Sequence, residues 1–343
     1  MRFFLGMDAG ASKTFCIVGD ESGRILGFGR GGPGNHQGPG LEAVVAEYRR
    51  AGEEALTQAG LRGDQVTHGA FCLAGADLPQ DYAMLIPAVR ALGLAQKITV
   101  KNDTIAALRS GLSRPWGVTV ICGSGTNAAG RGPDGTEIVF PGLGWISGDW
   151  GGGGDLAREA IRRVMRAWDG RGPQTMLTEM ILNALEMSDM AELLQALYQE
   201  PERLRSWLYR LPPLIFEAAY RGDAVAQELV TMQGEEVGIT AGAIIRRLGL
   251  TETDVEVVLG GSIFKAKGPL LFDVIAMTVH KIAPLARIVV PEFEPVVGAW
   301  LIALEAEGGQ ATPAVYEQLR ATMPASLRRS PSVPMDTASA QGL

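Results

Sequence analysis

The stretch Leu5-Gly6-Met7-Asp8-Ala9-Gly10-Ala11-Ser12-Lys13-Thr14 lies near the beginning of the 343-residue chain, and its pattern is the starting point for predicting the fold. An apolar run leads into a glycine turn and a second apolar run follows it, which predicts a β-hairpin. The turn offers backbone N–H groups, the hydroxyls of Ser12 and Thr14 and the Lys13 ammonium to an anion such as phosphate. Asp8 precedes the turn, where a carboxylate could hold Mg²⁺ through water. The alternative is an ordinary hairpin in which Asp8 serves only the turn.

A second stretch, Val118-Thr119-Val120-Ile121-Cys122-Gly123-Ser124-Gly125-Thr126-Asn127, repeats the pattern of strand, glycine turn and strand. This weak echo suggests a duplicated domain and not a short-period repeat. Residues 123–128 also match the dinucleotide fingerprint G-x-G-x-x-A, but that fingerprint requires a helix to begin inside it. Gly130, Gly132 and Pro133 follow instead, so we expect a β-hairpin here as well.

An acidic residue lies between the two glycine turns. Asp103 ends the short run Val100-Lys101-Asn102-Asp103 and precedes a predicted helix. It could be the N-cap of that helix, and it could also accept the proton of an attacking hydroxyl. The two roles are compatible. Asp149 lies in a glycine-rich loop where backbone can approach a ligand closely, or it is a solvated loop residue.

Composition excludes several classes of function. The formal charge of −7 and the pI near 5.2 leave no electrostatic footprint for nucleic acid or an anionic membrane. The apolar stretches are too short to span a bilayer, and we predict no signal peptide. Cys16, Cys72 and Cys122 lie far apart inside apolar runs, which predicts buried thiols of a reducing compartment and no structural zinc or iron–sulfur site.

Strands and helices mix along the whole chain in two similar halves, which predicts a two-domain α/β protein. The predicted strands are 3–7, 14–18, 25–28, 69–73, 98–100, 117–122, 127–130, 136–140, 255–259 and 287–290. The predicted helices include 41–59, 81–92, 103–112, one that begins near residue 156, 270–280 and 296–307. Residues 174–248 are mostly helical by the same criteria. The last residues, 323–343, are rich in Ser, Pro and Ala, which favours disorder.

These motifs, in this order, resemble the sugar kinase, actin and heat-shock ATPase superfamily. The chain looks most like its N-acetylglucosamine kinase-like branch, grouped with the BadF/BadG/BcrA/BcrD-type ATPases. The resemblance covers residues 3–307, and its pieces are 5–14, 32–35, 101–108, 122–128, 142–161 and 259–262. It implies two ribonuclease-H-like, actin-like ATPase domains with an ATP cleft between them. The N-terminal domain would be residues 1–115, with a last helix at 294–307 packing back on it, and the C-terminal domain would be residues 116–293 with a helical insert.

The resemblance also implies roles for individual residues. Asp103 falls at the family's catalytic base, and Asp8 falls at the acid associated with Mg²⁺. The residues implied in ATP binding are Gly10, Ser12, Lys13, Thr14, Gly123, Ser124, Gly125, Thr126, Gly260, Gly261 and Ser262. The residues implied in binding the sugar are Asn35, Asn102, Asp103, Asn127, Gly148 and Asp149.

The sequence departs from the family pattern after Asp149. The family usually continues Glu-Gly-Ser, whereas this chain continues Trp150-Gly151-Gly152-Gly153-Gly154. Leu143 also stands where a Trp is frequent. The two phosphate loops differ from the family only mildly and keep their hydroxyl groups. We therefore expect intact phosphate machinery and a reshaped sugar pocket.

The resulting hypothesis is a cytoplasmic, ATP- and Mg²⁺-dependent kinase for the 6-hydroxyl of an amino sugar, with N-acetylglucosamine as the favoured acceptor. Glucosamine and N-acetylmuramic acid are alternative acceptors. The resemblance implies a homodimer, and we expect a small-molecule sugar as partner, with no nucleic acid and no membrane. A second hypothesis is a BadF-type ATPase that activates a dehydratase or reductase, which needs paired cysteine ligands for an iron–sulfur cluster. A third is a sugar- or nucleotide-sensing regulator on the same scaffold.

Overall fold

The computed structural model describes residues 1–199, 206–207 and 209–328, which form two compact units. The first unit contains residues 1–119, 129–139 and the described chain from residue 289. The second unit contains residues 120–128 and 140–288. The division expected from the sequence lay between residues 115 and 116. The first unit differs from that expectation because it also takes in residues 129–139, a segment in which Ala129 pairs with Val139.

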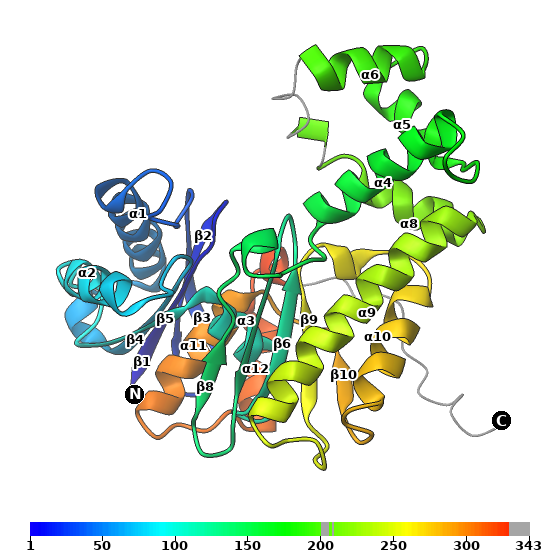
Figure 1. Cartoon of the computed structure of the whole chain (residues 1–343). Helices are drawn as coiled ribbons and strands as arrows, with labels where there is room; N and C mark the ends of the chain where they lie inside the picture. Colours follow the sequence, from blue (N-terminus) through cyan, green and yellow to red (C-terminus); the bar gives the residue numbers. More distant parts are fainter. Residues whose placement is uncertain (200–205, 208, 329–343) are drawn as a thin grey trace. The chain divides into compact units, whose positions relative to one another are not determined.

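The first unit is built on a five-stranded sheet with the strand order β3-β2-β1-β4-β5 (Figure 1). Its strands are β1 (Phe3–Ala9), β2 (Thr14–Asp20), β3 (Ile25–Gly31), β4 (Val66–Leu73) and β5 (Lys97–Asn102). The three N-terminal strands form an antiparallel meander, while β4 and β5 run parallel to β1. The predicted hairpin at residues 5–14 is thereby confirmed.

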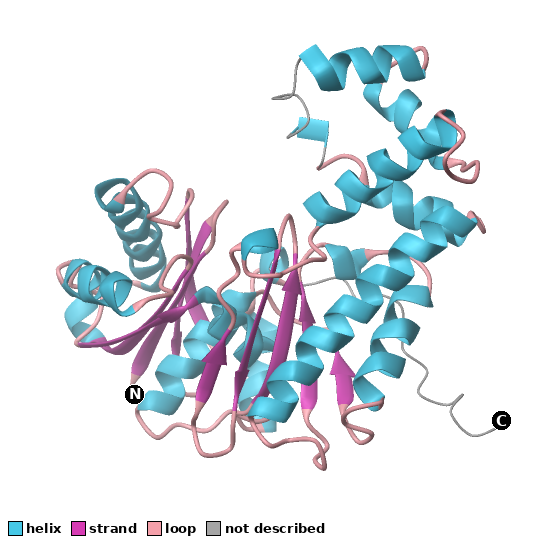
Figure 2. Ribbon diagram, viewed as in Figure 1, coloured by secondary structure: helices cyan, strands magenta, loops and turns pink. Residues whose placement is uncertain are grey.

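Helices cover both faces of this sheet (Figure 2). On one face, α1 (Leu41–Ala59) and α2 (Pro79–Arg90) bury a core that includes Leu5 and Met7 of β1. On the other face, α3 (Asp103–Gly111) and α11 (Pro295–Ala306) bury Phe4 and Ile17. Alternate residues of β1 thus enter different cores, as the two-residue period of a strand requires.

Helix α11 returns from the end of the chain to the centre of the first sheet. Its Trp300 is fully buried and meets Phe4 edge-to-face at 6.3 Å between ring centroids. A Cβ atom on Gly6 would lie 2.3 Å from the backbone nitrogen of Trp300, so only glycine lets the helix approach the strand this closely. The segment that follows adds α12 (Pro313–Thr322) to the same core.

Order extends further toward the C-terminus than the composition predicted. Residues 323–328 were expected to be disordered, but they include a short 3-10 helix at Ala325–Leu327. Leu327 is fully buried, and its backbone oxygen accepts a hydrogen bond from the Glu294 N–H at 3.1 Å. Met323 is buried in the same core, so two apolar side chains and this backbone hydrogen bond anchor the segment. The rest of the expected tail, residues 329–343, lies outside the described residues.

A second sheet has the order β10-β9-β6-β7-β8. Its strands are β6 (Gly117–Cys122), β7 (Thr126–Arg131), β8 (Glu137–Val139), β9 (Glu256–Gly260) and β10 (Arg287–Val289). A strand, not a helix, begins at Thr126 directly after the second glycine turn. The nucleotide-fingerprint interpretation is therefore excluded, and the expected hairpin is confirmed.

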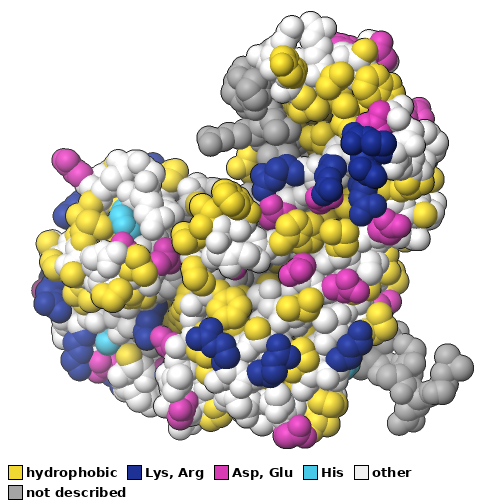
Figure 3. All heavy atoms as spheres, viewed as in Figure 1, with side chains coloured by type: hydrophobic (Ala, Val, Ile, Leu, Met, Phe, Trp, Pro, Cys, Tyr) yellow, Lys and Arg dark blue, Asp and Glu magenta, His cyan; other side chains and the backbone are white. Residues whose placement is uncertain are grey.

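Helices make up most of the second unit. They are α4 (Gly153–Trp168), α5 (Leu177–Leu185), α6 (Met190–Gln199), α8 (Pro212–Tyr220), α9 (Ala224–Arg247) and α10 (Leu270–His280). Helix α4 is strongly amphipathic: Leu156, Ala160 and Val164 are buried, whereas Arg side chains gather on its exposed face (Figure 3). The long helix α9 packs closely on α10, since a Cβ on its Gly238 would lie 2.4 Å from the Thr278 side chain.

Candidate active site residues in the two units

Three parallel strands end side by side at one edge of the first sheet because of their register. Ala9 pairs with Leu73 and Leu73 pairs with Asn102, so the parallel strands β1, β4 and β5 end side by side. Asp8 is the last but one residue of β1, and Asp103 directly follows β5. The carboxyl ends of parallel strands are where α/β proteins place their ligands. The sheet thus brings together two of the acids selected from the sequence.

Asp103 is the first residue of α3 and is partly buried. Burial and, to a smaller extent, the neighbouring charge of Asp77 together raise the pKa of its carboxyl to about 6. Backbone N–H groups of Thr104 and of Asp103 itself donate to the carboxylate and act in the opposite direction. The N-cap is Asn102 and not Asp103, because the Asn102 side chain accepts from the Thr104 N–H at 2.9 Å. This corrects the N-cap interpretation and leaves the Asp103 carboxylate available for chemistry.

A hydrogen-bonded network holds Asp77, whose charge acts on the Asp103 carboxylate, and the sequence reasoning missed it. The Asn102 amide donates to Asp77 Oδ1 at 2.7 Å, and the Gln37 amide donates to Asp77 Oδ2 at 3.5 Å. Asp81 accepts the backbone N–H of Leu78 at 2.7 Å and lies 3.4 Å from His36 Nε2. Burial and the Asp81 charge raise the pKa of Asp77.

A sequence signal for this network did exist. Residues 74–81 directly follow β4 just as Asp103 follows β5, so polar side chains there reach the same edge of the sheet.

Asn35 lies beside the same strand ends. Its side-chain oxygen accepts the Gln37 N–H at 2.9 Å, and a Cβ on Gly75 would lie 2.6 Å from that oxygen. Gly75 also has a φ of +81°, which favours glycine. The expected sugar-binding residues of the first unit, Asn35, Asn102 and Asp103, therefore belong to adjoining segments.

The first glycine loop is only partly open to a ligand. Ser12 is exposed and its hydroxyl is available, and the Gly10 N–H is used within the turn, donating to the Lys13 carbonyl at 3.0 Å. Thr14 is fully buried and its hydroxyl donates to the Gly32 carbonyl at 2.9 Å. The Thr14 hydroxyl is thus committed to holding the turn in this structure. The Lys13 ammonium lies 3.4 Å from a Glu294 carboxylate oxygen, a partner that no local sequence pattern suggests.

The second glycine loop contacts the N-terminus of α4 within the second unit. The Gly153 N–H donates to the Gly123 carbonyl at 2.8 Å, and the Gly154 N–H donates to the Ser124 carbonyl at 2.9 Å. These bonds join the loop at residues 123–126 to the N-terminus of α4. A Cβ on Gly152 would lie 2.3 Å from the Gly125 Cα, so this approach requires glycine. The glycine run that departs from the family pattern is therefore what allows the contact.

A third glycine loop, residues 260–262, packs on β6, the strand that precedes the second glycine loop. Gly261 has a φ of +107°, and a Cβ there would lie 2.1 Å from the Cys122 carbonyl oxygen. A cavity of about 290 Å³ opens between Ser124, Ser262 and the side chains of α8. It is lined by Gly123, Ser124, Gly153, Tyr209, Pro212, Pro213, Phe216, Ser262, Ile263, Lys265 and Ala266. Backbone amides, hydroxyls, an ammonium and aromatic rings are groups that suit a nucleotide.

The expected sugar-binding residues of the second unit lie on a loop with exposed apolar side chains. A Cβ on Gly142 would lie 2.8 Å from the Asn127 amide, so the loop begins against Asn127. Gly148 has a φ of +81°, and the Asp149 carboxylate accepts the Ser147 hydroxyl. Trp145 is 84% exposed in this loop. The loop therefore carries a polar and an aromatic group of the kinds that contact sugars.

The cysteines match the expectation from the sequence. Cys16, Cys72 and Cys122 are all free and fully buried, and burial raises the pKa of each thiol. Among the described residues, no group of three or more His, Cys, Asp or Glu side chains could hold a metal ion. A single carboxylate such as Asp8 fits Mg²⁺, which keeps several waters and takes its other ligands from phosphates. Within the described chain, no helix combines the length and the hydropathy that a bilayer crossing needs.

Comparison with known proteins shows the family and the fold of this chain. The family described as BadF/BadG/BcrA/BcrD ATPase matches residues 5–303. The N-acetyl-D-glucosamine kinase of Dictyostelium discoideum is 28% identical over 320 residues, which cover 89% of this chain and 99% of that protein. The N-acetylmuramic acid/N-acetylglucosamine kinase of Clostridium acetobutylicum is 26% identical over 303 residues, covering 88% and 98%. A crystal structure from Chromobacterium violaceum, provisionally named N-acetylglucosamine kinase, is 24% identical with a TM-score of 0.65, covering 88% and 99%. The two-domain α/β fold is shared with that structure.

Proposed function

Because the chain belongs to the BadF/BadG/BcrA/BcrD ATPase family, we propose that it transfers phosphate from ATP to the 6-hydroxyl of an amino sugar. N-acetylglucosamine is the proposed acceptor, since the two kinases described above carry this sugar in their names. The observation that carries the proposal is the position of Asp103, where strand β5 ends and helix α3 begins, with its carboxyl pKa raised to about 6. Such a carboxylate is ionised at neutral pH and is more basic than an exposed one.

In the proposed reaction, Asp103 accepts the proton of the sugar hydroxyl as that oxygen attacks the terminal phosphorus of ATP. The bond from phosphorus to the bridging oxygen of ADP breaks as the new ester forms. Asn102 holds Asp77 and caps α3, so it positions the base. The proposal assigns the sugar to Asn35, Asn102, Asp103, Asn127, Gly148 and Asp149.

The nucleotide is assigned to the glycine loops. Within the second unit, the cavity beside Ser124 and Ser262 supports placing the adenosine and the phosphates there. The α4 N-terminus adds positive potential to the second loop, which favours a phosphate. Asp8 would hold Mg²⁺, which when bound neutralises charge on the transferred phosphate. The first loop would contribute the Ser12 hydroxyl and the backbone N–H groups of the loop, whereas the Thr14 hydroxyl already donates to the Gly32 carbonyl.

The activator hypothesis is less well supported by the structure. A cluster shared between subunits needs exposed cysteine ligands, and all three thiols of this chain lie buried in strands. The proposal includes a cytoplasmic location and a homodimer. Sedimentation of the purified protein would test the homodimer.

The test of the function is ADP release from ATP and Mg²⁺ against N-acetylglucosamine, glucosamine, N-acetylmuramic acid and glucose, with mass detection of the products. We expect release that depends on an amino sugar, together with a product heavier by one phosphate. Release that is equally fast without any sugar would contradict the kinase and support the activator.

A further inference from the structure

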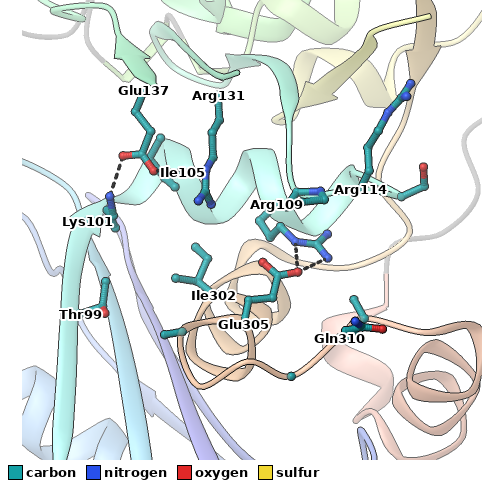
Figure 4. Close-up of a pocket in the computed structure, with 15 residues that line it drawn as sticks. Thr99, Lys101, Ile105, Arg109, Arg114, Arg131, Glu137, Ile302, Glu305 and Gln310 are labelled. Atoms are coloured by element: carbon teal, nitrogen blue, oxygen red, sulfur yellow. Dashed lines mark hydrogen bonds and ion pairs between the residues drawn. The ribbon is translucent and has the colours of Figure 1, made fainter. Parts of the chain in front are cut away.

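A polar cavity in the first unit lies outside the residues assigned to the reaction. Its volume is about 440 Å³, and its walls come from β5, α3, β7, β8, α11 and the segment after α11 (Figure 4). All of these lining residues belong to the first unit. Such a volume is in the range of small-molecule sites.

The cavity is cationic in a chain that is acidic overall. Four of its six ionisable lining side chains are basic, whereas the whole chain has a formal charge of −7. The basic residues are Lys101, Arg109, Arg114 and Arg131, and the acids are Glu137 and Glu305. The surplus of two positive charges matches the charge of a dianion.

The basic residues differ in how strongly they are already paired with carboxylates. Arg109 is buried and holds Glu305 through two hydrogen bonds at 3.0 and 2.7 Å, so this pair is structural. Lys101 and Arg131 instead share one carboxylate, Glu137, at 2.7 and 3.9 Å.

Arg131 is the side chain with unused hydrogen-bonding capacity. Figure 4 shows its guanidinium pointing from β7 into the cavity toward α3. It donates no side-chain hydrogen bond to any residue that the structure describes, and the 3.9 Å contact with Glu137 is its one ion pair there. A planar guanidinium with free donors beside a lysine is the arrangement that binds phosphate oxygens.

We propose that this cavity binds a small phosphate monoester, with Arg131 and Lys101 on the phosphate. The isoleucines Ile105 and Ile302 give an apolar wall, and the Thr99 and Gln310 side chains offer polar groups to a hydroxylated body. The cavity exceeds what inorganic phosphate alone would fill, which favours an ester of sugar size.

Binding is tested by calorimetry on the full chain with both substrate positions occupied. The protein is saturated with Mg²⁺, a non-hydrolysable ATP analogue and N-acetylglucosamine, and then titrated with glucose 6-phosphate. Glucose and inorganic phosphate serve as comparison ligands. The readout does not require turnover, so failure of this site and failure of the proposed kinase activity are distinguishable.

Two variants with opposite expected effects separate binding from misfolding. Arg131→Gln should weaken glucose 6-phosphate binding at least about tenfold, because it removes a charged hydrogen-bond donor. Glu137→Gln should tighten it by about three- to tenfold, because it releases Lys101 and Arg131 from their shared carboxylate. Arg49→Gln, on an exposed side chain of α1, is the charge-matched control and should bind like wild type.

Four results would overturn the proposal. They are the absence of saturable binding to wild type, unchanged affinity in Arg131→Gln, equal or weaker affinity in Glu137→Gln, and inorganic phosphate binding as tightly as the ester. The last result would show that the body of the ester contributes nothing.

Discussion

Replacing Asp103 with Asn should have two opposite effects, one on turnover and one on stability. Asparagine keeps the size of the side chain and an oxygen that can accept the Thr104 N–H, but it carries no charge. It cannot accept the proton of an attacking hydroxyl, so we expect turnover to fall by about 10²- to 10⁴-fold. It also removes a carboxylate whose ionised form is disfavoured by burial and by the Asp77 charge. We therefore expect the variant to be more stable than wild type at neutral pH.

The size of the stability gain follows from the pKa. A shift from about 3.9 in the unfolded chain to about 6 in the folded protein corresponds to about 3 kcal/mol. Because the Asp103 side chain is partly exposed, screening by solvent reduces this, and we expect about 1–2 kcal/mol. The sign follows from the raised folded pKa, since ionisation costs more in the folded state. The cost is absent below about pH 4, complete above about pH 6 and about half as large at pH 5.

The assay is urea unfolding of wild type and Asp103→Asn at pH 7.5 and pH 5, alongside steady-state kinetics. Asp64→Asn is the matched control, since the Asp64 side chain is 66% exposed in the same unit. The control should not change turnover. Near wild-type turnover in Asp103→Asn would refute the assignment of the base. A stability gain that does not shrink at pH 5 would refute the role of burial.

Three further substitutions test the surroundings. Asp77→Asn removes a charge that raises the pKa of the candidate base, so the acidic limb of the kcat/KM profile should move to lower pH. Gly261→Ala places a Cβ 2.1 Å from the Cys122 carbonyl at a positive φ, and calorimetry should show at least about tenfold weaker binding of an ATP analogue. Gly298→Ala places a Cβ 1.9 Å from the Ala106 carbonyl where α11 meets α3, and urea unfolding should show a loss of about 2–4 kcal/mol.

For each of these substitutions, one outcome would contradict the prediction. An unchanged pH profile in Asp77→Asn would show that its charge does not reach the base. Gly38→Ala is the control for the glycine variants, because a Cβ there would meet nothing closer than 3.9 Å at an ordinary φ. Nucleotide affinity or stability in either test variant equal to that of this control would contradict the packing described here.

Much of the fold could be predicted from the sequence because its signals are local. The alternation and glycine turn at residues 3–20 predict a hairpin, and the hairpin is present. An acidic residue directly after an apolar strand is expected at the edge of the sheet, because the edge is formed by strand ends. This predicted the position of Asp103. The Gly-Pro sequence after residue 129 was enough to exclude a helix, and β7 occupies that position.

The features that could not be predicted depend on residues distant in the sequence. Lys13 pairs with Glu294, and Thr14 turns its hydroxyl inward to Gly32, so two residues expected to face a phosphate have protein partners. No local pattern indicates either contact. The network around Asp77 is a different case: it joins three segments that the sheet register brings together, and the position of residues 74–81 directly after β4 was a signal for it that the prediction did not use.

Phosphate transfer to the 6-hydroxyl of N-acetylglucosamine can be followed by proton-detected phosphorus NMR of a reaction mixture of enzyme, ATP, Mg²⁺ and this sugar. We expect a new phosphate ester whose phosphorus couples to the two protons on carbon 6, formed in proportion to ADP. Coupling to the proton on carbon 1, or ADP accompanied only by inorganic phosphate, would contradict this expectation.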